Sequence, residues 1–311
     1  MKKLKKPVVM LAAWALVFGL TACGDAAEPA GGLADRPTVD PSGAEITVPD
    51  QIDSIAVLAP SLTEMVTALG HGDRIVAYDT SSVGLEGIPG DVPVLDTVSP
   101  DMEQLLALTP DVLFVSNLSL YDQESPYQQL IDNGVCVVCV PTSDSIADIQ
   151  SDIAFVAAVL DETEQGEKLI ADMQAEIDRI AAIAANITEK KTVYFEISAA
   201  PYMYSFGTGV FLNELIELIG AKNILAGQEG WLSVGEETVV AADPDVILTN
   251  VNYIEDPVQE IKDRSGWDAL TAVQNGAVSY IDNMASSLPD QNVVKALIQM
   301  AKAIYPEYYG E

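Results

Sequence analysis

Short apolar segments alternate with helical segments along the chain from Ile46 onward. Continuous apolar runs bounded by turn residues are typical of buried strands, and apolar residues that recur every three or four positions are typical of helices. The predicted strands cover residues 54–58, 74–78, 111–116, 135–140, 193–197, 245–249 and 278–281, and the predicted helices cover 61–69, 101–108, 126–133, 146–160, 210–219 and 291–305. Such alternation predicts largely parallel sheets covered by helices.

One long amphipathic segment separates two groups of strands. Residues 161–189 contain no proline and one glycine, Gly166, and their apolar residues recur at spacings of three and four. A helix over this range would be about 40 Å long at 1.5 Å per residue. We therefore predict an α/β protein with two lobes, residues 46–160 and 190–311, whose largely parallel sheets are joined by one long rigid helix, residues 161–189.

The two lobes contain an internal sequence repeat. The segment EQLLALTPDVL, which starts at Glu103, resembles ETVVAADPDVI, which starts at Glu237. Each begins as a short helix, continues through Pro-Asp into an apolar strand, and ends at Asn117 in one copy and Asn250 in the other. Helix, Pro-Asp and strand form a common unit, so chance is one explanation. The other, which we favour, is that the lobes are equivalent.

The first residues have the pattern of a lipoprotein signal peptide. Four lysines among residues 2–6 precede an apolar run over residues 7–20, which is shorter than the roughly 20 residues needed to span a bilayer. Leu-Thr-Ala-Cys follows, where small residues admit a peptidase and the thiol of Cys23 would take the lipid. We predict a signal peptide over residues 1–22, a membrane anchor at Cys23 and a flexible tether over residues 23–45. An ordinary secretory signal is the alternative, and either one places the protein outside the cytoplasmic membrane.

Charge and length narrow the classes of function. The net charge is −32, and loss of residues 1–22 removes four lysines and no acidic residue, which leaves about −36. Such an acidic surface repels phosphate backbones, so nucleic acid is excluded as a partner. The chain beyond the tether, roughly 265 residues, is long enough for two domains. We expect a monomer.

The positions of the cysteine and histidine residues indicate no metal or redox site. Cys136 and Cys139 have C-x-x-C spacing, but they fall in a valine-rich predicted strand, where residues three apart point to opposite faces. A redox or zinc motif needs both sulfurs together, so we interpret these residues as two buried structural thiols. The single histidine, His71, is expected in a solvated turn, and no resident metal or cofactor is predicted.

Several motifs resemble those of one family of binding proteins. They are AVLAPSLTE from Ala56, ALG from Ala68, DRI from Asp73, the two E-x6-P-D segments, FLNELIELIGAKNI from Phe211, and Trp231 with the following Ser-Val. Their order and spacing over about residues 52–306 are similar to those of ABC-importer binding proteins for cobalamin, iron–siderophores and haem. The resemblance implies two α/β lobes bridged by a rigid helix, a ligand in the cleft between them, and delivery to a permease dimer with its ATPase.

The resemblance also implies that each lobe presents an exposed glutamate to arginines of the permease. The matching positions are Glu103 and Glu237, with Glu236 as a one-residue alternative to the second. Two carboxylates held apart on a rigid body would orient it on a dimeric transporter and speed docking. Both residues would also favour a helix N-terminus through the helix dipole, which is compatible with docking.

Ligand contacts are expected from loops at the strand ends. The predicted ligand-binding residues are Ser61, Tyr78, Thr97, Tyr121, Tyr202, Tyr204, Phe206 and Trp231. The aromatic segment 201–206 would suit a large planar or conjugated ligand, although it could instead pack on its own lobe. No Lys or Arg falls in a predicted ligand loop, which favours a corrinoid or a neutral hydroxamate chelate over an anionic catecholate or citrate chelate.

Other functions stay as alternatives to this prediction. Haem could be held through Tyr204, Met203 or Met284. A Ser-His-Asp hydrolase would depend on His71, and no serine lies in a G-x-S-x-G element. Composition does not exclude a carboxylate-dependent glycosidase or a structural surface lipoprotein. We predict a binding protein and not an enzyme.

Overall fold

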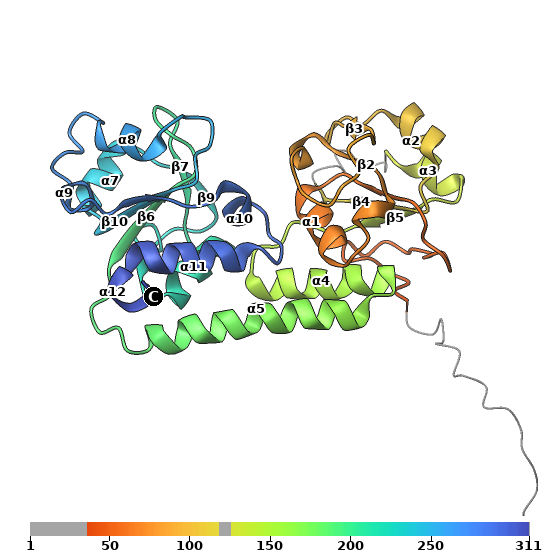
Figure 1. Cartoon of the computed structure of the whole chain (residues 1–311). Coiled ribbons are helices and arrows are strands. Elements are labelled where there is room, and N and C mark those ends of the chain that lie inside the picture. The colour runs from red at the N-terminus through yellow and green to blue at the C-terminus, as the bar shows by residue number, and fades with distance from the viewer. Residues whose placement is uncertain (1–35, 118–125, 311) are drawn as a thin grey trace, which may run out of the picture. The chain divides into compact units, whose positions relative to one another are not determined.

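The computed structural model describes residues 36–117 and 126–310, so the predictions for Cys23 and Tyr121 lie outside the described residues. The described chain forms an N-terminal lobe, a long helix and a C-terminal lobe (Figure 1). The predicted α/β fold with largely parallel sheets is confirmed. No helix within the described ranges is long and apolar enough to cross a membrane.

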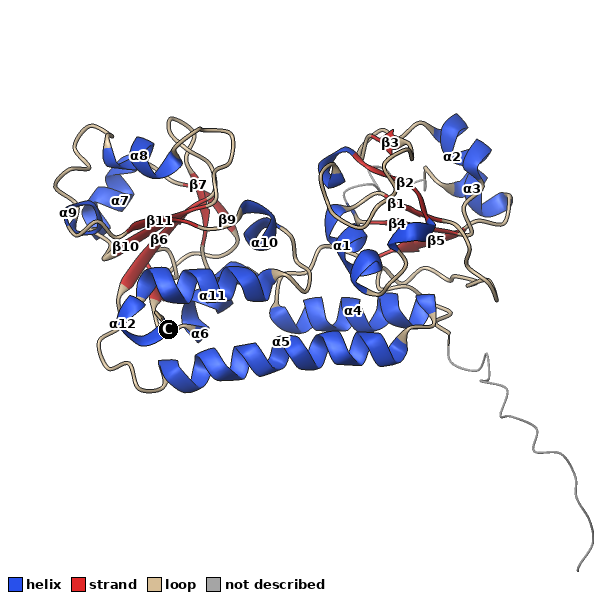
Figure 2. Cartoon of the chain, viewed as in Figure 1, coloured by secondary structure: helices blue, strands red, loops and turns tan. Residues whose placement is uncertain are grey.

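The N-terminal lobe is built on one parallel sheet. Its elements are β1 (Ile55–Val57), α1 (Pro60–Ala68), a 3-10 turn (Gly72–Arg74), β2 (Ile75–Asp79), a second 3-10 turn (Thr80–Ser82), β3 (Val94–Leu95), α2 (Met102–Leu108), β4 (Val112–Val115), α3 (Gln128–Asp132), β5 (Cys136–Cys139) and α4 (Ile146–Leu160). The strand order is β3-β2-β1-β4-β5, and each neighbouring pair is parallel (Figure 2). Buried residues of α1 and α4 pack on one face of the sheet and those of α2 and α3 on the other, which explains the continuous apolar runs in β1 and β4.

The C-terminal lobe repeats this plan with a smaller sheet. Its elements are β6 (Thr192–Glu196), β7 (Tyr204–Phe206), α6 (Phe211–Leu218), β8 (Lys222–Asn223), β9 (Trp231–Ser233), α7 (Glu236–Ala242), β10 (Val246–Thr249), α8 (Pro257–Lys262), α9 (Thr271–Gln274), β11 (Val278–Tyr280), α10 (Asn283–Ser287), α11 (Val293–Ile304) and α12 (Pro306–Tyr309). The parallel strands lie in the order β11-β10-β6-β8. A separate antiparallel ribbon, β7 with β9, follows the carboxyl end of β6.

The long helix α5 (Thr163–Ala184) is shorter at both ends than the predicted range 161–189. Asp161 has a left-handed backbone with φ 62°, which ends α4 and separates it from α5. Gly166 allows the two helices to approach each other, because a Cβ added there would lie 2.5 Å from the Cβ of Ala157. The single glycine of the amphipathic segment therefore serves close packing between α4 and α5.

The internal sequence repeat is also a repeat of structure. The Asp111 carboxylate accepts hydrogen bonds from the main-chain N–H and the hydroxyl of Ser54, both at 2.8 Å, and the Ser54 hydroxyl accepts from Asp111 N–H at 3.1 Å. Asp245 and Thr192 make the same exchange at 2.7, 2.8 and 3.0 Å. Each exchange joins the starts of two neighbouring parallel strands, β1 with β4 and β6 with β10. The lobes are equivalent at this point.

The described part of the predicted tether is packed against the N-terminal lobe, which differs from the prediction. Asp40 is buried, and its carboxylate accepts from the main-chain N–H groups of Ser42 and Ala44 at 3.0 and 2.9 Å. The other oxygen accepts from the N–H of Cys139 in β5 at 2.9 Å. The Gly- and Pro-rich composition resembles a linker, but this bond to a distant strand fastens residues 36–45.

The two cysteines lie on opposite faces of β5, as predicted. Cys136 belongs to the apolar core on the α1 and α4 side, whereas Cys139 belongs to the core on the α2 and α3 side. Both thiols are free, and burial raises the pKa of each to about 11. At neutral pH they are therefore protonated and weakly reactive.

Candidate functional site

The predicted contacts of the N-terminal lobe lie at or near the carboxyl ends of its strands. Ser61 is the second residue of α1, directly after β1, and is half-buried. Tyr78 lies near the end of β2 and packs against the core. Thr97 follows β3, and its hydroxyl donates to the buried carboxylate of Asp79 at 3.4 Å. Ligands of open parallel sheets bind at this edge, so the position suits all three residues.

The C-terminal lobe presents aromatic side chains on the β7–β9 ribbon. In the ribbon Tyr204 pairs with Ser233 and Phe206 pairs with Trp231. Side chains of directly opposed residues share a face, as do residues two apart, so Tyr204, Phe206 and Trp231 lie on the same face. Tyr204 and Trp231 are 41% and 45% exposed, and Tyr202, just before the ribbon, is 84% exposed.

Phe206 belongs to the core and supports the exposed ring beside it. Its side chain is fully buried, with its centroid 5.6 Å from Phe195 and 5.9 Å from Trp231 in an edge-on contact. For this residue the structure therefore shows packing on its own lobe, the alternative weighed for the aromatic segment. Such edge-on contacts hold a neighbouring ring in one orientation.

Hydrogen bonds fix the ribbon to the sheet. The Ser205 hydroxyl donates to the carbonyl of Phe195 in β6 at 2.6 Å. The Asn223 side chain, from β8, donates to the carbonyl of Phe206 at 2.9 Å. Gly207 then passes so close to Gln228 that an added Cβ would lie 2.1 Å from its carbonyl oxygen. The aromatic face is thus held on a rigid support.

Tyr253 is an exposed aromatic residue that was not among the predicted ligand contacts. It follows the carboxyl end of β10, is 66% exposed, and its hydroxyl accepts from the main-chain N–H of Ala199 at 2.8 Å. Because β10 and β6 are parallel neighbours, this ring lies at the same sheet edge as the segment that leads into the ribbon. Its position four residues beyond a predicted strand was the available signal. Tyr202, Tyr204, Trp231 and Tyr253 are called the aromatic surface below.

Arg264 is a buried cation of the C-terminal lobe, and its charge is paired with two carboxylates. Arg264 binds both carboxylate oxygens of Glu196, the last residue of β6, at 2.6 and 2.7 Å. It also binds Glu260 on α8 through its Nε at 2.9 Å, and its guanidinium lies over the ring of Trp267 and 3.8 Å from the sulfur of Met203. Two carboxylates face one guanidinium, so the cluster has one excess negative charge. The cluster therefore has no unpaired positive charge that could bind an anionic ligand.

The two predicted docking residues occupy equivalent, exposed positions. Glu103 is the second residue of α2 and Glu237 is the second residue of α7, and both helices begin at the carboxyl edge of their sheet. The Glu237 carboxylate lies back over Gly235, where an added Cβ would be 2.4 Å from its Oε1. Glu236 is the first residue of α7, and its charge acts on Glu196. Position in the helix therefore matches Glu237, and not Glu236, to Glu103.

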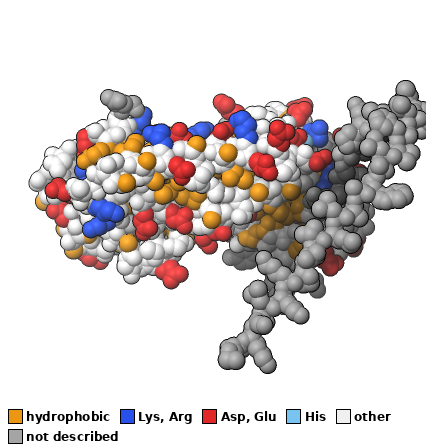
Figure 3. All heavy atoms as spheres, turned by 90° about the horizontal axis from the view of Figure 1, so that it is seen from below, with side chains coloured by type: hydrophobic (Ala, Val, Ile, Leu, Met, Phe, Trp, Pro, Cys, Tyr) orange, Lys and Arg blue, Asp and Glu red, His pale blue; other side chains and the backbone are white. Residues whose placement is uncertain are grey.

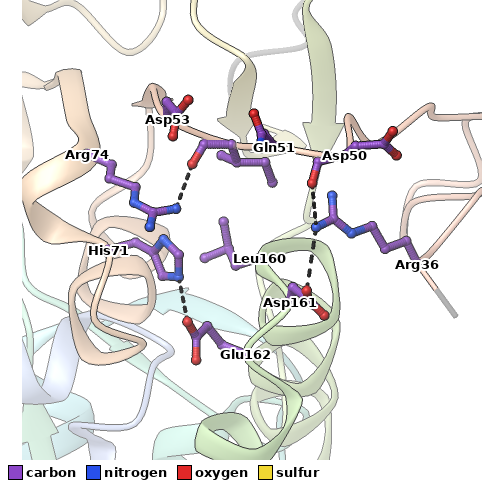
Figure 4. A pocket seen from close by; sticks show the side chains of 10 residues that line it. Arg36, Asp50, Gln51, Asp53, His71, Arg74, Leu160, Asp161 and Glu162 are labelled. Atoms are coloured by element: carbon purple, nitrogen blue, oxygen red, sulfur yellow. Dashed lines mark hydrogen bonds and ion pairs between the residues drawn. The ribbon is translucent and has the colours of Figure 1, made fainter. Parts of the chain in front are cut away.

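A separate pocket of about 450 Å³ lies at the opposite edge of the N-terminal sheet (Figure 4). Its lining includes Ile52, just before β1, and Arg74, just before β2, whose Nη1 donates to the carbonyl of Ile52 at 2.7 Å. His71 also lines it and is buried, with its Nε2 3.1 Å from the Glu162 carboxylate. The prediction of a solvated histidine was wrong, because the turn after α1 packs on the corner between α4 and α5.

The described residues offer few groups that could bind a metal or haem. Within residues 36–117 and 126–310 no cluster of three or more His, Cys, Asp or Glu side chains could hold a metal ion. Met203 is 2% exposed and lies against Arg264, so it is not placed to ligate haem, whereas Met284 is half-buried and Tyr204 is exposed.

Two parallel α/β sheets, a long helix between them and an exposed aromatic surface at the strand ends define a two-lobed solute-binding protein. The chain belongs to the periplasmic binding protein family, whose family model matches residues 55–285. It is 26% identical to the uncharacterized ABC transporter substrate-binding lipoprotein YvrC of Bacillus subtilis, over 94% of this chain and 95% of that protein. It is 25% identical to the molybdate-binding protein MolA of Haemophilus influenzae, over 90% of this chain and 87% of that protein.

Solved structures show the same fold. A possible iron-binding, periplasmic solute-binding protein of Staphylococcus epidermidis matches with a TM-score of 0.72 and 26% identity, over 82% of this chain and all of that one. Molybdate-bound MolA matches with a TM-score of 0.74 and 23% identity, over 89% of this chain and 93% of that one.

Proposed function

We propose that this protein is the extracytoplasmic solute-binding component of an ABC importer, and that its ligand is a large neutral or cationic chelate. A corrinoid is our first candidate, and a neutral ferric hydroxamate is the second. The observation that carries the proposal is the rigid aromatic surface at the strand ends. In the same lobe, the buried cation Arg264 is paired with two carboxylates and leaves no free positive charge. The protein delivers its ligand to a permease dimer and catalyses no reaction.

The chemistry of the surface supports this ligand class. Aromatic rings bind large conjugated ligands through their faces, while a phenol such as that of Tyr204 offers a hydrogen bond to an amide or hydroxamate. An oxyanion such as molybdate, named for the relative MolA, needs several donors or an unpaired cation. Vitamin B12-binding proteins are also among the relatives, for example one of Vibrio parahaemolyticus with 23% identity over 81% of this chain.

Haem capture is an alternative function, supported by a single observation. Tyr204 is an exposed phenol at the strand ends, and tyrosine can ligate haem iron. Haem carries two propionates, however, and the excess negative charge of the Arg264 cluster disfavours an anionic ligand near this lobe. The corrinoid candidate therefore ranks first.

A ligand titration tests the proposal. Residues 24–311, which contain the whole compact unit from Asp35 to Glu311, would be titrated with cyanocobalamin, a neutral ferric hydroxamate, a ferric catecholate and haem. Trp231 is exposed and Trp267 is buried, so a ligand on the aromatic surface should quench part of the tryptophan fluorescence. We expect saturable quenching at sub-micromolar concentration, on the order of −8 kcal/mol or better, by cyanocobalamin or by the hydroxamate. Binding of the catecholate alone, or of none of the four, would contradict the proposal.

The aromatic surface has its own control. The variant Trp231→Ala should weaken binding at least about tenfold by calorimetry, because buried interface aromatics contribute roughly 2 kcal/mol or more. The matched variant Tyr308→Ala removes a ring that is equally exposed at 45%, on α12, and should leave the affinity unchanged. Equal effects of the two variants would place the ligand elsewhere.

We also propose that the protein is anchored to the membrane by a lipid on Cys23. The lipobox at residues 20–23 supports this, as does the description of the relative YvrC as a lipoprotein. The variant Cys23→Ala should lose the lipid and move from the membrane fraction to the soluble extracytoplasmic fraction on cell fractionation. Retention of this variant in the membrane fraction at the wild-type level would refute the anchor.

A further inference from the structure

The contact between α1 and the loop joining α10 to α11 contains a buried carboxyl group with an unpaired oxygen. Asp290 is fully buried, and its Oδ1 accepts from the main-chain N–H of Asn292 at 2.7 Å. Its Oδ2 and the Oε1 of the adjacent Gln291 are both buried without a partner among the described residues. The Nε2 of Gln291 donates to the carbonyl of Glu64 on α1 at 3.2 Å. Buried acceptors without donors are costly and require an explanation.

A proton on Asp290 supplies the missing donor. A protonated carboxyl group has one O–H, so a proton on Oδ2 turns this unpaired acceptor into a hydrogen-bond donor. The Oε1 of Gln291 or the side chain of Glu64 could accept the new hydrogen bond. Burial raises the pKa of Asp290 to about 8, and hydrogen bonds from the main-chain N–H and the side chain of Asn292 lower it. The charged groups that act on Asp290 are Glu64, which raises the pKa, and Lys295 on α11, which lowers it. Asp290 is therefore protonated at neutral pH.

We propose that Asp290 is a proton-dependent latch between the lobes, in which the protonated side chain holds the α10–α11 loop against α1. Glu64, Asp290 and Gln291 are called the lobe junction. Ionised Asp290 would put a second carboxylate beside Glu64 and leave both orphan acceptors unpaired, so the closed junction loses stability as the pH rises. Glu64 lies one helical turn after Ser61, so opening moves the part of α1 that carries a predicted ligand contact. The latch requires no ligand and stands apart from the proposed function.

Hydrogen exchange of the junction across pH tests the latch. Peptides covering residues 288–297 would be followed from pH 6 to 9.5 in residues 24–311, with exchange rates corrected for the intrinsic effect of pH. Opening lets the Asp290 carboxyl group ionise at its ordinary pKa, well below 8, so protection should fall about tenfold per pH unit from pH 6 to about pH 8. Above about pH 8 the closed junction is itself ionised, so the fall should level off at this transition. The variant Asp290→Asn mimics the neutral carboxyl group, so its corrected protection should not depend on pH.

Two further variants keep the test decisive. Glu64→Gln removes a neighbour that raises the Asp290 pKa, so the transition should move to lower pH. Asp282→Asn changes an exposed aspartate at the N-cap of α10 and should keep the wild-type transition. The latch is overturned if wild-type protection is constant up to pH 9.5, or if Asp290→Asn shows the same transition. Should Asp290→Asn fail to fold at pH 6, the Glu64→Gln shift decides in the same way.

Discussion

Replacing Arg264 with alanine is expected to lower the free energy of unfolding by about 3–5 kcal/mol. The Arg264 and Glu196 side chains are 6% and 1% exposed, and Arg264 binds both oxygens of that carboxylate. Alanine would leave the buried charge of Glu196 with no partner, remove the guanidinium from the ring of Trp267, and leave a cavity. Urea unfolding at pH 7, followed by tryptophan fluorescence, measures the loss. After cleavage at residue 22 both remaining tryptophans, Trp231 and Trp267, lie in the lobe that contains Arg264.

The chain provides a matched control for this variant. Arg179 pairs with Glu176 at 2.8 Å on the surface of α5, where the two side chains are 47% and 38% exposed. Arg179→Ala should cost less than about 1 kcal/mol, because solvent screens an exposed pair. If Arg264→Ala were as mild as Arg179→Ala, Glu196 would have to take a proton or reach water, and its ion pair would not stabilise the lobe.

Reversing charge at both predicted docking residues should abolish uptake without affecting ligand binding. Glu103 and Glu237 are exposed, lie at the same position of equivalent helices, and occur one per lobe. In the double variant Glu103→Arg with Glu237→Arg, like charges would meet the permease at two points, and each such contact costs several kcal/mol. We expect uptake of the ligand into cells to fall at least about a hundredfold, while the affinity in solution stays unchanged.

The control carries the same change in net charge. Glu167 on α5 and Glu189 after it are both exposed, so the double variant Glu167→Arg with Glu189→Arg should transport normally. Equal loss of uptake in both double variants would mean that overall charge, and not these two sites, governs docking. Unchanged uptake in Glu103→Arg with Glu237→Arg would rule out the docking role.

The buried strands could be predicted from sequence as continuous apolar runs, and the long helices from their period. The buried strands β1, β4, β5, β6 and β10 and the helices α4, α5 and α11 lie within or close to their predicted ranges. The short elements β3, β8, β7, β9, α8, α9, α10 and α12 were missed. None of these segments contains an apolar run of four residues or a full amphipathic period, so such elements form because their neighbours supply hydrogen bonds and burial.

The candidate site could be predicted only in part, because some of its features depend on contacts between residues that are distant in the sequence. Aromatic residues near strand ends are visible in sequence, which is how Tyr202, Tyr204 and Trp231 were found. That Phe206 is buried depends on its contacts with Phe195 of β6 and with Trp231, which lies 25 positions away and is brought opposite by the β7–β9 register. The importance of Tyr253 depends on β10 lying beside β6, which sequence does not reveal.

The sequence by itself determined the α/β class, the two lobes with the long helix between them, the repeated Pro-Asp unit, and the acidic composition of the chain. These follow from local periodicity and composition, which each segment carries alone. Only the tertiary structure decided that Arg264 is neutralised, that His71 is buried, that Asp40 fastens residues 36–45, and that Asp290 faces Glu64. Burial and pairing of a charge depend on groups brought together from distant parts of the chain, and no local pattern records which groups those are.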